Sequence, residues 1–209
     1  MRNAMTTLAF GLMLSALAAA HAQDVRVTHS HVVWIGLASG SETEAIVASE
    51  LRDLMRTRDV EPWILTREIL VDNEQIPHSH PVLTIHTRHV GEELQLLSTF
   101  IHEQLHWLEE KPWLQDFQAA MADFEELFPV VPSSTDGGAR DEQSTYRHLL
   151  VCDMELQALT TLVGPTAARE TLMQNTHYEW IYDKVLTDPR VREVVLRHGF
   201  DVSEGIPSR

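Results

Sequence analysis

The segment of residues 92–109 constrains the fold more than any other part of the chain. Its apolar side chains recur at spacings of three and four residues, which predicts a half-buried α-helix that ends before Pro112. These side chains are Leu94, Leu97, Ile101, Leu105 and Leu108. His102 and His106 border this stripe, one helical turn apart on the same side. The fold must therefore leave room beside the helix for two neighbouring imidazoles.

The two histidines belong to the sequence His102-Glu103-Gln104-Leu105-His106, which has the pattern H-E-x-x-H. Two imidazoles so spaced can bind one metal ion, most often zinc, at about 2.0–2.1 Å. Glu103 points about 100° around the helix axis from His102, which suits a general base that acts on a zinc-activated water. The alternative is a pair of surface histidines on an amphipathic helix, since 12 histidines in the chain make a chance match easier.

A third ligand has to come from elsewhere in the chain. A closed structural zinc site built on several thiolates is excluded, because Cys152 is the single cysteine. A catalytic site needs three protein ligands, and we predict Glu155 as the third. It lies on a predicted helix of residues 141–163, where Asp153 falls on another face. The neighbours of Glu155 at three and four residues are apolar, so a buried carboxylate there needs a partner such as a metal. The alternatives are a buried arginine as partner, or a side chain that reaches the rim of the core.

His148 lies on nearly the same face of that helix, two turns before Glu155. A rise of about 1.5 Å per residue separates the two by about 10.5 Å, which argues against joint coordination of one ion. We therefore predict that His148 is a catalytic donor placed over the substrate, where it stabilises an oxyanion. A histidine of the core or the rim is the alternative. Weaker candidates for the same donor are Tyr146, His177 and Tyr178.

Two further histidine pairs alternate along segments that can be extended: His29 with His31, and His78 with His80. Alternating residues share a face, so each pair could capture metal, although solvated loop residues are the simpler interpretation. Cys152 is predicted to be a small core residue and not a nucleophile.

The order of the predicted elements indicates an α+β domain. Residues 32–37, 63–71 and 82–88 are predicted strands, and residues 42–55 are a predicted helix. After the helix of residues 92–109, further helices are predicted at residues 113–128, 141–163, 166–174, 178–186 and 189–197. A small N-terminal sheet followed by a mainly helical half is typical of α+β folds.

The first 22 residues have the pattern of a secretory signal peptide. Arg2 precedes an apolar run of residues 8–20, and Ala20-His21-Ala22 fits the cleavage pattern. Residues 23–209 would then form one exported domain, periplasmic or secreted. An uncleaved N-terminal anchor is the alternative. The net charge of −15 argues against nucleic acid and anionic membrane surfaces as partners.

These residues resemble the zincin metallopeptidases of the gluzincin type. In that group, H-E-x-x-H lies on one helix and a glutamate on a later helix completes the zinc site. The resemblance rests on His102, Glu103, His106 and Glu155. It implies a zincin-like fold, one zinc ion per chain and cleavage of a peptide or protein substrate. It also implies that residues 82–88 form a sheet edge that pairs with extended substrate.

The chain departs from related patterns at several positions. Glu109 and Pro112 stand where a metzincin needs glycine and histidine, so that extension is absent. Ala158 stands near the place where some gluzincins carry an aspartate that supports a zinc histidine. Two alternatives to a peptidase stay open: a protein that binds a divalent metal without turnover, and an inactive zincin-like interaction domain.

Overall fold

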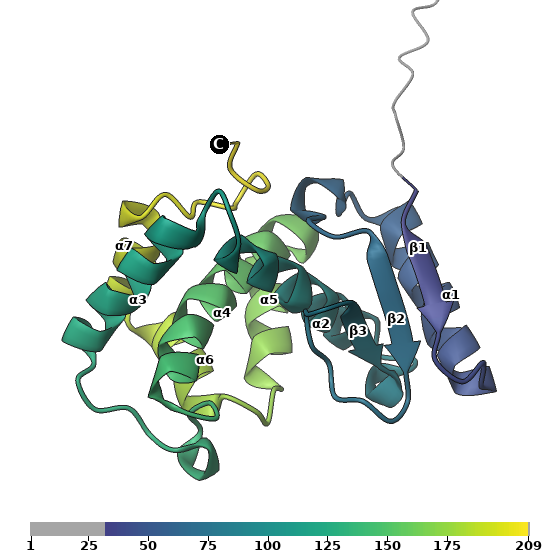
Figure 1. Cartoon of the computed structure of the whole chain (residues 1–209), viewed down its shortest axis with the longest axis horizontal. Helices are drawn as coiled ribbons and strands as arrows, with labels where there is room; N and C mark the ends of the chain where they lie inside the picture. The colour runs from purple at the N-terminus through teal and green to yellow at the C-terminus, as the bar shows by residue number, and fades with distance from the viewer. Residues whose placement is uncertain (1–31, 209) are drawn as a thin grey trace, which may run out of the picture. The chain divides into compact units, whose positions relative to one another are not determined.

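The computed structural model describes residues 32–208, and Figure 1 shows their arrangement. The predicted signal peptide and the pair of His29 and His31 lie outside these residues. Within residues 32–208, the regular structure consists of one three-stranded sheet near the N-terminal end, seven α-helices and short 3-10 helices. The α+β prediction is confirmed. No helix in this part of the chain is long and apolar enough to cross a membrane.

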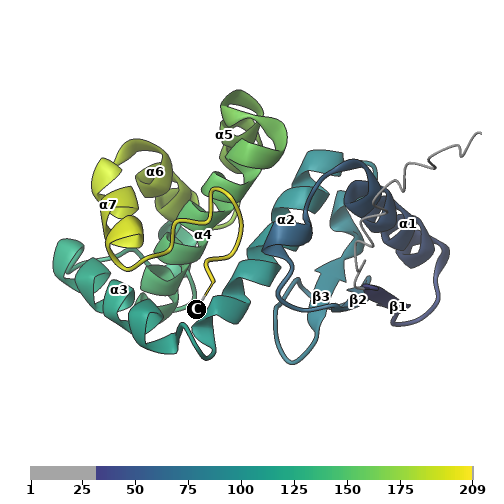
Figure 2. The ribbon, with the colours of Figure 1, turned by 90° about the horizontal axis from the view of Figure 1, so that it is seen from above.

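The sheet is parallel, with the strand order β1-β2-β3. Its strands are β1 (Trp34–Leu37), β2 (Glu68–Asp72) and β3 (Leu83–His86). Helix α1 (Glu42–Thr57) supplies the crossover that two parallel neighbours require. It contacts β1 and β2, while α2 (Glu93–Leu105) contacts β3 and α1. Figure 2 shows both helices on one side of the sheet, so the sheet anchors α2 from below in that view.

Glu44 fixes the start of α1. Its carboxylate accepts a hydrogen bond from the backbone N–H of Ser41 at 3.2 Å, while the Ser41 hydroxyl accepts one from the Glu44 N–H at 3.3 Å. This reciprocal pair is a capping box. The same carboxylate accepts from the backbone N–H groups of Ser39, Gly40 and Asn73. Glu44 therefore ties the loop after β1 to the loop after β2.

The outer edge of β3 is partly covered by the preceding loop. His78 pairs with Thr84 in an antiparallel bridge, with N–O distances of 3.2 Å and 2.7 Å. Strand β3 does lie at the edge of the three-stranded sheet and directly precedes the turn into α2. Its main-chain groups at Thr84, however, are already satisfied by His78. The expectation that this strand offers its edge to an extended substrate does not hold at that position.

The C-terminal half is built around one long helix, α4 (Glu142–Val163). Helices from both ends of the chain pack against it: α2, α3 (Leu114–Leu127), α5 (Pro165–Met173), α6 (Glu179–Thr187) and α7 (Pro189–Arg197). The 3-10 helices are η1 (Glu61–Trp63), η2 (Thr87–His89), η3 (His106–Glu109) and η4 (Ser134–Asp136). The predicted helix of residues 92–109 thus changes to 3-10 geometry at His106.

Because other helices surround α4, the faces that carry Asp153 and Glu155 are both buried, although only the Glu155 face was expected to be. Asp153 is 0% exposed, although it lies on another face than Glu155. Its carboxylate accepts a hydrogen bond from Nε of Arg192 on α7 at 2.9 Å and from the Gln157 amide at 3.1 Å. An arginine, which was considered as a partner for Glu155, therefore pairs with Asp153 instead, although the Arg192 side chain itself is partly exposed.

Candidate metal centre

The predicted site residues come together where α2 meets α4. His102 and Glu103 lie in the last turn of α2, and His106 begins η3 directly after it. His148 and Glu155 come from α4, which packs against α2. All five side chains are buried. The crossing of these two helices therefore concentrates the polar groups that the sequence placed on separate predicted helices.

Three imidazole rings form a compact triangle. The ring centroids are 5.0 Å apart for His102 and His106, 5.5 Å for His102 and His148, and 5.1 Å for His106 and His148. Nε2 of His102 lies 3.3 Å from Nε2 of His106. Two nitrogens bound to one tetrahedral zinc at about 2.0–2.1 Å lie about 3.3–3.4 Å apart, so this spacing fits a shared ion. One ring nitrogen of each histidine lies within 4.8 Å of the others.

The other nitrogen of each ring, Nδ1, faces a hydrogen-bond acceptor. Nδ1 of His102 lies 2.9 Å from the Glu155 carboxylate, Nδ1 of His106 lies 2.8 Å from the Glu109 carboxylate, and Nδ1 of His148 lies 2.6 Å from the carbonyl oxygen of Ser144. A neutral imidazole that donates from Nδ1 keeps Nε2 free as an acceptor. Acceptors of this kind orient the histidine ligands of metal ions in proteins.

Both carboxylate oxygens of Glu155 are already engaged. One accepts a hydrogen bond from the Ser98 hydroxyl, and the other accepts from Tyr182 Oη at 2.9 Å and from His102. Glu155 is only 1% exposed. Together with Cys152 and His102 it forms a second group of side chains with metal-ligating atoms within 4.8 Å. The structure thus brings Glu155 and His148 to the same histidine: Glu155 lies at Nδ1 of His102, and the His148 ring stacks with the His102 ring.

Burial and mutual repulsion act on the protonation of the histidines. Burial lowers the pKa of His106 and of His148 well below the usual value, and the charge of His102 lowers both further. Burial also lowers the pKa of His102, but Cys152 and Glu155 outweigh it, so that this pKa is raised well above the usual value. The metal-free site therefore favours one positive charge, held at His102 beside Glu155.

Glu103 and a set of polar side chains line a cavity of about 560 Å³ over the three histidines. Burial raises the pKa of Glu103 to about 6. Tyr178 also lines the cavity, and its ring tilts against His148 with centroids 4.3 Å apart. Burial raises the Tyr178 pKa, which keeps its hydroxyl protonated near neutral pH. The backbone of Tyr178 is left-handed (φ 61°), a conformation that is rare for a non-glycine residue and costs about 1–3 kcal/mol.

The remaining predicted residues divide between the cavity and the core. His177 and the pair of His78 and His80 line the cavity wall. Tyr146 does not, because its hydroxyl donates to the carbonyl of Phe128 in the core at 2.9 Å. Sequence reasoning missed Ser98, Glu109 and Tyr182. Glu109 follows His106 by three residues, a spacing at which helical side chains meet, so the pattern could have suggested it.

Comparisons with protein-family models, curated proteins and solved structures found no match to this chain. The site therefore has to be interpreted from its own geometry.

Proposed function

We propose that the protein is a zinc-dependent hydrolase that cleaves peptide bonds, with His102, His106 and His148 as the zinc ligands. The observation that carries this proposal is the convergence of three imidazoles whose Nδ1 atoms each face an acceptor. Three histidine ligands are the number that a catalytic zinc site uses, and they would leave room for a water or substrate oxygen. The H-E-x-x-H sequence supplies two of these ligands and the adjacent carboxylate.

In this proposal His148 replaces Glu155 as the third ligand. His148 offers a ring nitrogen to the triangle, whereas both oxygens of Glu155 already accept hydrogen bonds from protein donors. Glu155 therefore acts as a positioning residue that holds the His102 ring and makes its Nε2 a better donor of electrons to a metal. Glu109 has the same role for His106, and Arg147 fixes Glu109 through an ion pair at 2.8 Å.

A zinc ion held by the three histidines would supply a Lewis acid that activates water and polarises the scissile carbonyl. Glu103 accepts the proton of the attacking water and passes it to the leaving amine. A carboxylate with a pKa of about 6 is mostly deprotonated at neutral pH and still gives the proton up readily. The Tyr178 hydroxyl takes over the part of the oxyanion donor that the sequence had suggested for His148.

The cellular setting follows from the sequence alone and is part of the proposal. A signal peptide at residues 1–22 would export the protein to the periplasm or the outside of the cell. A cavity of about 560 Å³ is in the range of sites for ligands the size of a short peptide. The substrate is accordingly a peptide or an accessible segment of a protein.

The decisive experiment compares Glu103→Gln with Glu126→Gln, an exposed glutamate on α3. Each purified mature protein is analysed for zinc and assayed against a broad peptide library. We expect about one zinc per chain in all forms, and a fall in hydrolysis of about 10²–10⁴-fold for Glu103→Gln only. If the wild type binds zinc but hydrolyses no peptide, the alternative of a metal-binding protein without turnover would be supported instead. Equal activity of Glu103→Gln and the wild type would contradict the mechanism.

A further inference from the structure

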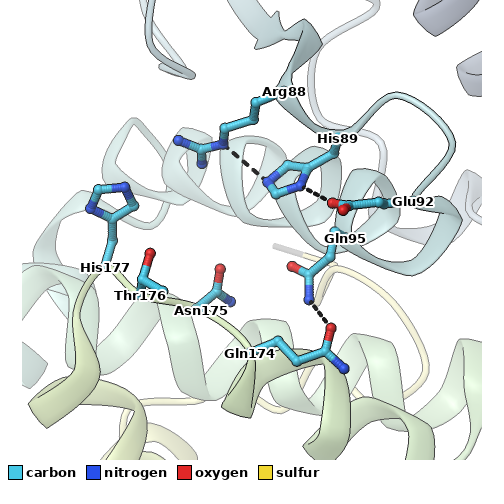
Figure 3. A pocket seen from close by; sticks show the side chains of 8 residues that line it. All are labelled: Arg88, His89, Glu92, Gln95, Gln174, Asn175, Thr176 and His177. Atoms are coloured by element: carbon cyan, nitrogen blue, oxygen red, sulfur yellow. Dashed lines mark hydrogen bonds and ion pairs between the residues drawn. The ribbon is translucent and has the colours of Figure 1, made fainter.

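A second cavity, of about 220 Å³, adjoins the one over the three histidines. Arg88, Asn175 and His177 line both, so the two cavities lie side by side. Figure 3 shows the second cavity, which we call the Arg88 cavity. Its wall is formed by the turn after β3, the start of α2 and the loop between α5 and α6. A substrate bound over the histidines can therefore extend into it.

The Arg88 side chain is held in place while its terminal nitrogens stay available. Its backbone N–H donates to Nδ1 of His86 at 2.8 Å, which fixes the turn. Its Nε donates to Nε2 of His89 at 3.0 Å, and Nδ1 of His89 lies 2.8 Å from the Glu92 carboxylate. Figure 3 shows the far end of the guanidinium turned towards His177 and away from Glu92. His89 thus stands between the guanidinium and Glu92, the glutamate among the described residues that line this cavity.

Most arginines of the described chain form ion pairs with carboxylates of the protein, and Arg88 does not. Eight arginines form ion pairs with carboxylates of the protein: Arg56, Arg58, Arg67, Arg140, Arg147, Arg190, Arg192 and Arg197. Within residues 32–208, no carboxylate forms such a pair with Arg88. In a chain with a net charge of −15, an arginine that faces a cavity and forms no ion pair with the described carboxylates is a candidate for binding a carboxylate of a ligand.

Amide groups line the Arg88 cavity from Gln95 on α2 to the facing wall at Gln174 and Asn175. Gln95 donates from its amide to the side-chain oxygen of Gln174 at 3.2 Å and to the carbonyl of Thr171 at 2.9 Å. Asn175 and Thr176 continue this wall towards His177. The amide and hydroxyl groups can donate to an anion, and none of them adds a negative charge.

Arg88 also lies near the proposed catalytic groups, because it lines the cavity over the histidines together with Glu103 and Tyr178. A substrate whose reacting carbonyl lies at the histidines can therefore place a carboxylate at Arg88.

We propose that Arg88, with Asn175 and His177, forms a carboxylate-binding subsite, so that the enzyme selects peptides that carry a carboxylate next to the scissile bond. The carboxylate comes from an aspartate or glutamate side chain or from the C-terminus of the substrate. This inference rests on the proposed peptidase function and names its substrate class.

The test measures binding to the zinc-loaded Glu103→Gln protein, which does not consume its ligand. The probes are N-dansyl pentapeptide pools in which Glu or Gln occupies each position in turn, each made as a free acid and as a C-terminal amide. Arg88→Gln is added to the Glu103→Gln background, and Arg52→Gln, an exposed arginine of α1, serves as the matched control. Thermal unfolding confirms that each variant is folded.

We expect one class of carboxylate to bind about 10–100-fold more tightly than its amide counterpart, as suits hydrogen bonds between charged groups. Arg88→Gln should remove this preference, Arg88→Lys should restore part of it, and Arg52→Gln should retain it. A preference for Glu over Gln indicates a side-chain carboxylate, and a preference for acid over amide indicates the C-terminus. Equal binding of acids and amides, or a preference that survives Arg88→Gln, would overturn the subsite. If the wild type cleaves nothing but the binding preference still depends on Arg88, the proposed subsite is supported and the proposed peptidase function is contradicted.

Discussion

The carboxylate of Glu155 lies 2.9 Å from Nδ1 of His102, while Nε2 of the same ring lies 3.3 Å from Nε2 of His106. The two nitrogens of one imidazole therefore face different partners. Glu155 meets Nδ1, and His106 meets Nε2. This arrangement would separate the groups proposed to hold a metal from the groups that orient its ligands.

The first prediction distinguishes a ligand from a residue that supports one. His148→Ala should weaken zinc binding far more than Glu155→Gln, for which a loss of about 10–100-fold is typical of a supporting carboxylate. Competition with a chelator of known affinity measures both, with circular dichroism to confirm folding. The reverse order of effects would return Glu155 to the role of third ligand.

A second prediction concerns the hydroxyl of Tyr178. Tyr178→Phe keeps the ring against His148 but removes a donor to the oxyanion, so kcat should fall by about 10²-fold while the zinc content stays the same. The control is Tyr146→Phe, which removes a hydroxyl that bonds Phe128 in the core. It should lower stability and leave kcat close to the wild-type value. A zinc-free Tyr178→Phe protein, or an unchanged kcat, would speak against the assignment.

The ion pair of Asp153 and Arg192 gives an asymmetric prediction for stability. Asp153 is 0% exposed, whereas the Arg192 side chain is 37% exposed and can turn to water when its partner is lost. Arg192→Ala leaves a buried carboxylate alone and should lower the free energy of unfolding by about 3 kcal/mol. Asp153→Asn should cost less, since its amide can still bond Gln157. Urea denaturation measures both, and equal losses would show that burial of Asp153 is not decisive.

The capping glutamate Glu44 predicts how stability depends on pH. Burial raises the pKa of Glu44, but hydrogen bonds from the backbone of Ser39, Ser41 and Asn73 outweigh it, and the pKa is lowered. A lowered pKa in the folded state stabilises the protein above the unfolded value of about 4.3, and this contribution disappears as the pH falls through the folded value. Urea midpoints of wild type and Glu44→Gln should therefore differ at pH 7 and converge as the pH drops below about 4. A constant difference across this range would contradict the prediction.

The helices were largely predictable because each carries its own periodicity and its own stops. Pro112 and the pair Gly164-Pro165 limit helices in the sequence, and α3, α4 and α5 begin or end within two residues of these or of the predicted positions. The change to 3-10 geometry at His106 was not predictable, because the apolar stripe continues through Leu108 without interruption.

The replacement of Glu155 by His148 as the proposed third ligand has a geometric cause. The sequence places both residues on one face of a helix, about 10.5 Å apart. It does not predict the position along that helix at which α2 packs against it. The crossing sets His148 beside His102 and His106, and sets Glu155 behind His102 among Ser98 and Tyr182. The position of Asp153 was missed for a related reason. An apolar stripe indicates which face is buried, but not that the remaining faces are covered by helices that come later in the chain.

The contact between α2 and α4 is also the seam between two halves of the molecule, since α2 packs on the sheet and α4 organises the helices. His102 and His106 approach from one side of this seam and His148 from the other. An ion bound by all three histidines would cross-link the sheet-bearing half to the helical half. Backbone amides on both sides of the seam should then exchange with solvent more slowly when the ion is bound, including amides far from the histidines.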